Sequence, residues 1–391
     1  MQRNIKIKSQ IIFIISLLNF LQWQKIKIMN KGQSKMNEIL KLPIHIANVA
    51  SVTDCWIYNR LAIIKTSPYY EDWIASHYNL YVGSDYNFHF GDISIYPPAY
   101  HEEILQRKPI RVLNFSPENI IEMLKEYLKN GYYIIMHIKP HKDYAYFHEV
   151  LFYGFDDEKE QFMTVGLQNR IFQTLMFQYS YIEDTIKEIQ NYYLSNEKRG
   201  MELALNYQYP ATALKLNPRF KSENCVFEAY LKLKRELNGE LHEVHGLSDF
   251  ADYRSASYVY RGISCLDAFK QMLEKEIKRE KFGKWFRGIS SAAKKLLEHR
   301  RMLICSMDYI LENWADAMTD YARTSAAEYS KCSLSVEKWL NLCLKYEHTQ
   351  DKQLLKRIVQ EVPEVFLKEK RFLEHFINDG IDWHKFNENY I

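Results

Sequence analysis

The sequence predicts an α+β protein whose first half combines helices with an antiparallel sheet and whose second half is α-helical. Residues 132–138, 148–155 and 161–167 are β-branched and aromatic runs of strand length. The polar segment 156–160 separates the last two runs, as a hairpin turn would. From about residue 205 onward, apolar residues recur at helical spacing instead.

The length of 391 residues exceeds one typical domain. We therefore expect a strand-containing domain over residues 37–205 and an α-helical domain over residues 206–391. The 52 Lys and Arg residues against 49 Asp and Glu residues leave a formal charge of +3, so charge indicates neither a nucleic acid nor a membrane as partner. No Gly-rich phosphate loop is present, and we expect no cofactor.

The six cysteines show no CxxC pair and no zinc-finger spacing, so no metal site is predicted. A disulfide framework is not typical of a long, helical chain. We therefore expect reduced thiols and a cytoplasmic protein.

The first residues contain one apolar run, Ile11–Leu21, which is too short to span a membrane. It resembles the apolar part of a signal peptide, but no small-x-small cleavage site follows it. Met29 and Met36 lie just downstream. Residues 1–36 are therefore expected to be an over-long gene call or a disordered leader, in preference to an export signal.

The expected helices of the first half follow from caps and apolar stripes. One helix begins near Cys55, a second covers 71–77, and a third has Ser116 as N-cap, Pro117 at its first position and Gly131 as its stop. A strand over 172–181 and a helix over 182–194 follow the hairpin. In the second half we expect four helices, the last of them broken at Pro363; these cover residues 266–280, 284–311, 335–347 and 353–376.

Cys55 is the strongest candidate nucleophile. Thr53 or Asp54 can cap its helix, which places the cysteine in the first turn. The helix dipole there lowers a thiol pKa, and the first-turn N–H groups can bind the oxyanion of a tetrahedral intermediate. Alone, a cysteine at such a position is more often a small buried apolar residue.

His148 is the preferred base, because it opens a hairpin strand directly after a helix-then-strand unit. His137 lies inside an apolar run and is expected to be a core histidine, while His141 is in the connecting loop. Cys265 is a rival nucleophile because Ser264 can cap its helix. His242 and His245 precede Cys265, but no strand presents them.

The Cys-Trp pair at the head of a helix, followed about 90 residues later by the strand sequence HEVLFYGFDDEKEQF, resembles the papain-like cysteine clan. Within that clan the sequence is similar to bacteriocin-processing peptidase domains and to the butirosin biosynthesis protein H family. The latter also adds helical sequence after its catalytic part. The segments 260–263 and 297–303 fit that helical part, and the similarity covers roughly residues 40–310.

The resemblance implies acyl transfer through a cysteinyl thioester. The donor would be the thioester of an acyl or peptidyl carrier protein, the acceptor an amine, and the product an amide in antibiotic biosynthesis. A cysteine peptidase would share the acyl-enzyme and differ in the second nucleophile. A third possibility is a non-catalytic binding protein on the same fold.

The sequence departs from the family pattern at two positions. An orienting Asp or Asn is expected 16 to 18 residues after the histidine, where this chain has Thr, Val and Gly at 164–166. Asn169, or else Gln168, is the replacement we favour, since Asp156 and Asp157 lie at the hairpin tip, roughly 25 Å away. The usual oxyanion-hole glutamine upstream of the cysteine is also missing. Asn48 is the candidate for that role, although it can equally cap a turn.

Overall fold

The structure is a computed structural model. It describes residues 38–47, 49, 55–77, 79–83, 88–91, 104–110, 117–139, 148–168, 171–194, 211–239, 258–280 and 288–390. The expected leader, residues 1–36, lies outside the described residues.

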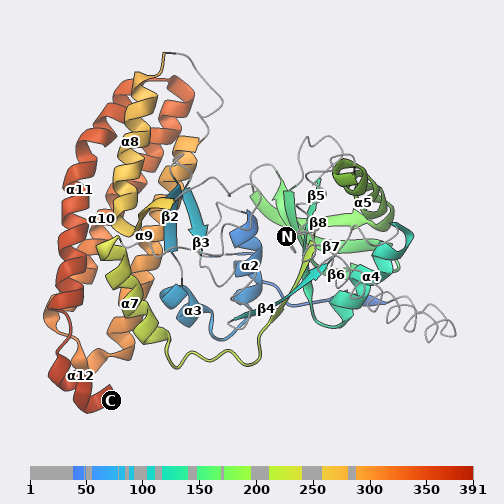
Figure 1. Cartoon of the computed structure of the whole chain (residues 1–391), viewed down its shortest axis with the longest axis horizontal. Helices are drawn as coiled ribbons and strands as arrows, with labels where there is room; N and C mark the ends of the chain where they lie inside the picture. The colour runs from blue at the N-terminus through green and yellow to red at the C-terminus, as the bar shows by residue number, and fades with distance from the viewer. Residues whose placement is uncertain are drawn as a thin grey trace, which may run out of the picture.

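A seven-stranded antiparallel sheet forms one half of the described structure (Figure 1). Its strand order is β4-β9-β5-β6-β7-β8, and β1 pairs with the far end of β6. The strands are β1 (Ile39–Lys41), β4 (Leu105–Ile110), β5 (Tyr133–Ile138), β6 (His148–Asp156), β7 (Gln161–Gln168), β8 (Ile171–Gln178) and β9 (Ala211–Leu216). The expected α+β class and the expected β6–β7 hairpin are both confirmed.

Helices cover both faces of this sheet (Figure 1). On one face lies α2 (Cys55–Ile64), whose Ile57 and Leu61 share a core with Leu151 of β6. On the other lie α4 (Pro117–Lys129) and α5 (Tyr179–Leu194), which pack on Val150 and Phe152. Side chains alternate between the two faces along a strand. In the first part of β6, the even-numbered residues therefore face α4 and α5, and the odd-numbered residues face α2.

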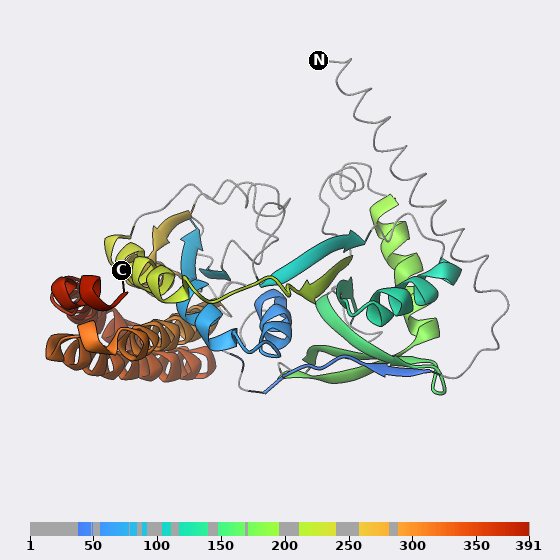
Figure 2. The ribbon, with the colours of Figure 1, turned by 90° about the horizontal axis from the view of Figure 1, so that it is seen from below.

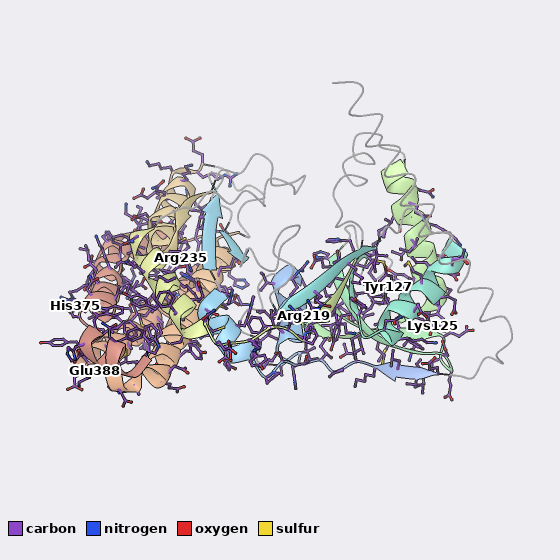
Figure 3. All side chains as sticks on the ribbon, turned by 60° about the horizontal axis from the view of Figure 1, so that its bottom comes forward. Lys125, Tyr127, Arg219, Arg235, His375 and Glu388 are labelled. Carbon is purple, nitrogen blue, oxygen red and sulfur yellow. The ribbon has the colours of Figure 1, made fainter. Side chains whose placement is uncertain are left out.

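The tip of the β6–β7 hairpin is held by its own acidic residues. The Asp156 carboxylate accepts hydrogen bonds from the backbone N–H groups of Glu158 and Lys159. Asp157 forms a 2.8 Å ion pair with Lys125 of α4, which is labelled in Figure 3. Both aspartates therefore stabilise the turn, at the opposite end of β6 from His148.

The other half of the described structure is mainly helical (Figure 2). Its helices are α3 (Tyr70–His77), α7 (Cys225–Asn238), α8 (Cys265–Lys278), α9 (Gly288–Asn313), α10 (Asp320–Thr349), α11 (Lys352–Asn378) and α12 (Trp383–Tyr390), with short 3-10 turns η4 (Gly262–Ser264) and η6 (Ala315–Ala317). A small sheet in the order β10-β2-β3 joins them, made of β2 (Asn79–Gly83), β3 (Phe88–Gly91) and β10 (Tyr258–Arg261). None of the described helices has the length and apolar character needed to cross a membrane.

The two halves are not divided at residue 205. Strand β9 comes after that position, yet it lies inside the large sheet between β4 and β5. Conversely, α3 packs on α7 and α9, and β2 pairs with β10. The chain therefore passes between the halves more than once. The sequence pattern missed this because strand pairing joins residues that are distant along the chain.

Two local features of the helical half differ from what the sequence suggests. Pro363 does not end its helix, because α11 continues from Lys352 to Asn378. Val362 and Val365, on either side of the proline, are buried, so packing holds the helix together despite the lost backbone hydrogen bond. Ser264 is the N-cap residue of α8, as expected, but it ends the preceding 3-10 turn and its side chain makes no capping hydrogen bond.

A cluster of charged residues is buried where α7, α9 and α11 meet. Lys232, Glu236, His299, Arg300 and Glu369 are all fully buried. The Arg300 guanidinium donates to both carboxylate oxygens of Glu369, at 3.2 and 3.0 Å. His299 Nε2 lies 3.3 Å from the Glu236 carboxylate. With a neutral imidazole, two positive and two negative charges balance in this interior.

Burial lowers the pKa of His299, an effect that nearby Arg300 and Lys232 reinforce and Glu236 opposes. The unfolded chain, where the histidine pKa is about 6.5, then binds this proton more readily than the folded chain. We expect the free energy of unfolding to fall as the pH drops below about 6.5. Urea unfolding at several pH values measures this effect. The free energy of unfolding should depend less steeply on pH in His299→Gln than in the unmodified protein. Equal slopes for the two proteins would contradict this assignment.

Candidate active site

Helix α2 begins at Cys55, so the expected first-turn position of this residue is confirmed. The next turn of the helix is docked on the beginning of β6. Asn59 Nδ2 donates to the backbone carbonyl of Glu149 at 3.5 Å, and Arg60 lies 3.2 Å from the Glu149 carboxylate. These contacts place the N-terminal part of α2 over the end of the sheet where β6 starts.

The same turn also contacts β8. The rings of Tyr58 and Phe172 stack with centroids 3.8 Å apart. Phe172 pairs with Leu167 at the end of β7. The first turns of α2 therefore lie over three strand ends: the start of β6, the end of β7 and the start of β8.

His148 opens β6, as expected from the sequence. Its cross-strand partner is Ile138, which belongs to the core beneath α4 and α5. Directly opposite residues of a sheet share a face. The register therefore places His148 on the α4–α5 face, whereas Glu149, the next residue, contacts α2. Burial lowers the pKa of His148, so the imidazole is neutral near pH 7.

Gln168, one of the two expected orienting residues, is the last residue of β7. Leu151 pairs with Val165, and continuing this register by three residues brings Gln168 opposite His148. The Gln173 side-chain amide donates to the Gln168 side-chain oxygen. The structure thus brings Gln168 and His148 to neighbouring strand positions, but on the face turned away from α2.

His137, which the sequence predicted to be a core histidine, lies on the α2 face. It is the cross-strand partner of Glu149, and it alternates in step with Ile135, which shares the core with α2. The strand period was visible in the sequence. The sequence did not show which face of β5 meets α2.

Three further polar residues at this site were missed: Asn59, Arg60 and Glu149. All three are buried. The Asn59 side-chain oxygen has no hydrogen-bond donor among the described residues. A buried amide oxygen at this place is a ready acceptor for an imidazole or substrate N–H group. The signal in the sequence was the Asn-Arg pair inside the otherwise apolar helix CWIYNRLAII.

Cys265 behaves as an ordinary core residue. It is fully buried, and its thiol lies 3.7 Å from the Leu80 carbonyl. Both observations disfavour it as a nucleophile. Of the remaining candidates, Asn48, Asn169, His141, His242 and His245 lie outside the described residues.

The arrangement offers the components of thiol chemistry: a helix N-terminus for the thiolate and the oxyanion, and histidines on the neighbouring strands β5 and β6. Comparison with protein-family models gave no match for this chain. A search of curated proteins likewise gave no match.

Proposed function

We propose that the protein is a cysteine-dependent acyltransferase with a papain-like site, in which Cys55 forms a thioester with the acyl group and passes it to an amine. One observation carries the proposal. The helix that begins with Cys55 is docked, one turn later, on the paired strand ends that carry His137 and His148. A nucleophile helix and histidine-bearing strands are the parts that such chemistry requires.

In the first step the Cys55 thiolate attacks the carbonyl carbon of a thioester donor, such as one on an acyl or peptidyl carrier protein. The bond between this carbon and the sulfur of the carrier breaks. The carrier sulfur leaves as a thiol, because it takes a proton from the imidazolium of the base histidine, which had received that proton from the Cys55 thiol. In the second step an amine attacks the cysteinyl thioester and gives its proton to the imidazole. An amide is released and the thiolate is restored, without any cofactor in the scheme.

Within this proposal the base is His137, because the strand register puts it on the face that α2 covers. Glu149 is its cross-strand neighbour, and Asn59 donates to the Glu149 backbone carbonyl, so within this proposal these two residues orient the imidazole. This choice replaces His148, whose register partner Ile138 faces α4 and α5.

Intact-protein mass spectrometry with acyl thioesters tests the nucleophile. We expect one acyl adduct in the unmodified protein, none in Cys55→Ala, and an undiminished adduct in Cys265→Ala. Iodoacetamide at neutral pH should alkylate Cys55 first, since a helix N-terminus favours the thiolate. A protein that takes up neither reagent at Cys55 would be a non-catalytic binding protein, the alternative that the placement of His148 and Gln168 favours.

Histidine variants test the base. We expect His137→Ala to slow acyl transfer by about 10²- to 10⁴-fold, the usual contribution of general acid–base catalysis. His148→Ala should retain most of the activity and serves as the matched control. If His148→Ala slowed acyl transfer more than His137→Ala, His148 would be the base instead. Adding amines to the acylated protein then separates the transferase from a peptidase, which would transfer the acyl group to water.

A further inference from the structure

The two edges of the large sheet differ in their protection against pairing. Edge strand β4 has the sequence LQRKPI, with Arg107, Lys108 and Pro109 in succession. Charged residues and proline are the devices by which natural edge strands avoid adding another strand. Edge strand β8 has the sequence IFQTLMFQ and carries neither.

The β8 edge is also long and apolar. It pairs with β7 along its full eight residues, and no described strand pairs with its other side. Ile171 is 66% exposed and Met176 is 51% exposed, although both are large apolar residues. In a chain with 26% charged residues, eight consecutive uncharged residues on an exposed edge favour strand addition.

We propose that β8 pairs with β8 of a second copy of this chain, in antiparallel orientation about a two-fold axis through Thr174. This register puts Thr174 opposite Thr174 and Phe172 opposite Met176, on the face shared with α2. Thr–Thr pairs and methionine–aromatic contacts are both favourable across strands. Ile171 then lies opposite Phe177 on the other face. Each of residues 171–177 therefore meets an uncharged residue of the second copy.

A second copy fits this edge better than a foreign segment because the match is self-complementary, as a two-fold interface requires. The formal charge of +3 also produces little repulsion between copies. The pairing does not depend on the chemistry of Cys55. Phe172 nevertheless stacks on Tyr58 of α2, so the interface would continue into the wall of the candidate active site.

Sedimentation velocity on the full chain tests the proposal. The unmodified protein should dimerise with a micromolar or tighter dissociation constant. Thr174→Lys and Thr174→Glu each put like charges directly opposite one another, and should raise that constant by at least about fivefold. An equimolar mixture of the two variants should form dimers again, because Lys then faces Glu. Recovery in the mixture also shows that both variants are folded.

Leu334→Lys is the matched control, since Leu334 is an exposed apolar residue on α10, away from the edge. It should leave the dimer unchanged. A monomeric unmodified protein at all concentrations would overturn the proposal. So would a dimer that the Thr174 variants do not weaken, or a variant mixture that stays monomeric.

Discussion

Replacing Glu369 by alanine is expected to lower the free energy of unfolding by about 3–5 kcal/mol, because it leaves the guanidinium of Arg300 charged and unpaired in the interior. Arg300 and Glu369 are both fully buried, and two hydrogen bonds join them. The cost arises from the remaining charge more than from the lost attraction. Urea-induced unfolding, followed by circular dichroism, measures the change.

Two variants make this prediction specific. Glu364→Ala, also on α11, removes the exposed partner of Lys368 and should change the free energy of unfolding by less than about 1 kcal/mol. The double variant Arg300→Met/Glu369→Leu removes both charges and should recover most of the loss. If the double variant were as unstable as Glu369→Ala alone, the ion pair itself, and not the isolated charge, would be the dominant contribution.

Gly262→Ala is expected to destabilise the protein by about 2–5 kcal/mol. Gly262 has a φ of +61°, a conformation that costs an alanine roughly 1–2 kcal/mol. Its added Cβ would also lie 2.3 Å from the backbone oxygen of Glu236 on α7, and relieving such overpacking costs about 1–3 kcal/mol. The turn between β10 and α8 would have to move away from α7.

Gly288→Ala is the matched control for this prediction. Gly288 begins α9, and a Cβ added there would meet nothing within 4 Å. Alanine at a helical position without strain should leave stability unchanged or raise it by up to about 1 kcal/mol. Thermal unfolding of both variants gives the comparison. Equal melting temperatures for the two variants would show that the turn at Gly262 adapts without cost.

Elements with a local signal were predictable from the sequence. The helix after Ser116, with its proline start and glycine stop, is α4, and Gly131 has a positive φ of 76°. The β6–β7 hairpin and the helix that begins at Cys55 also lie where the sequence put them. Elements without local periodicity were missed: β9 lies in a segment read as helical, because pairing with β4 and β5 decides its structure.

In the candidate site, too, local features were predictable from the sequence and features that depend on distant contacts were not. The first-turn position of Cys55 and the strand-opening position of His148 are local properties, and both hold. The face that each histidine occupies is not local. It depends on the register of β5 against β6 and on which side of the sheet α2 packs, and these put His137, not His148, on the face that α2 covers.

By itself, the sequence determined the α+β class, the helix that begins at Cys55 and the hairpin, because capping residues, turn residues and apolar spacing act within a few residues of one another. Only the tertiary structure decided how β9 completes the large sheet and where the ion pair between Arg60 and Glu149 docks α2. It also decided which histidine lies on the face of the sheet that α2 covers. Each of these depends on contacts between residues far apart in the chain. A one-residue change of register would reverse the faces of a strand without any change in its local pattern.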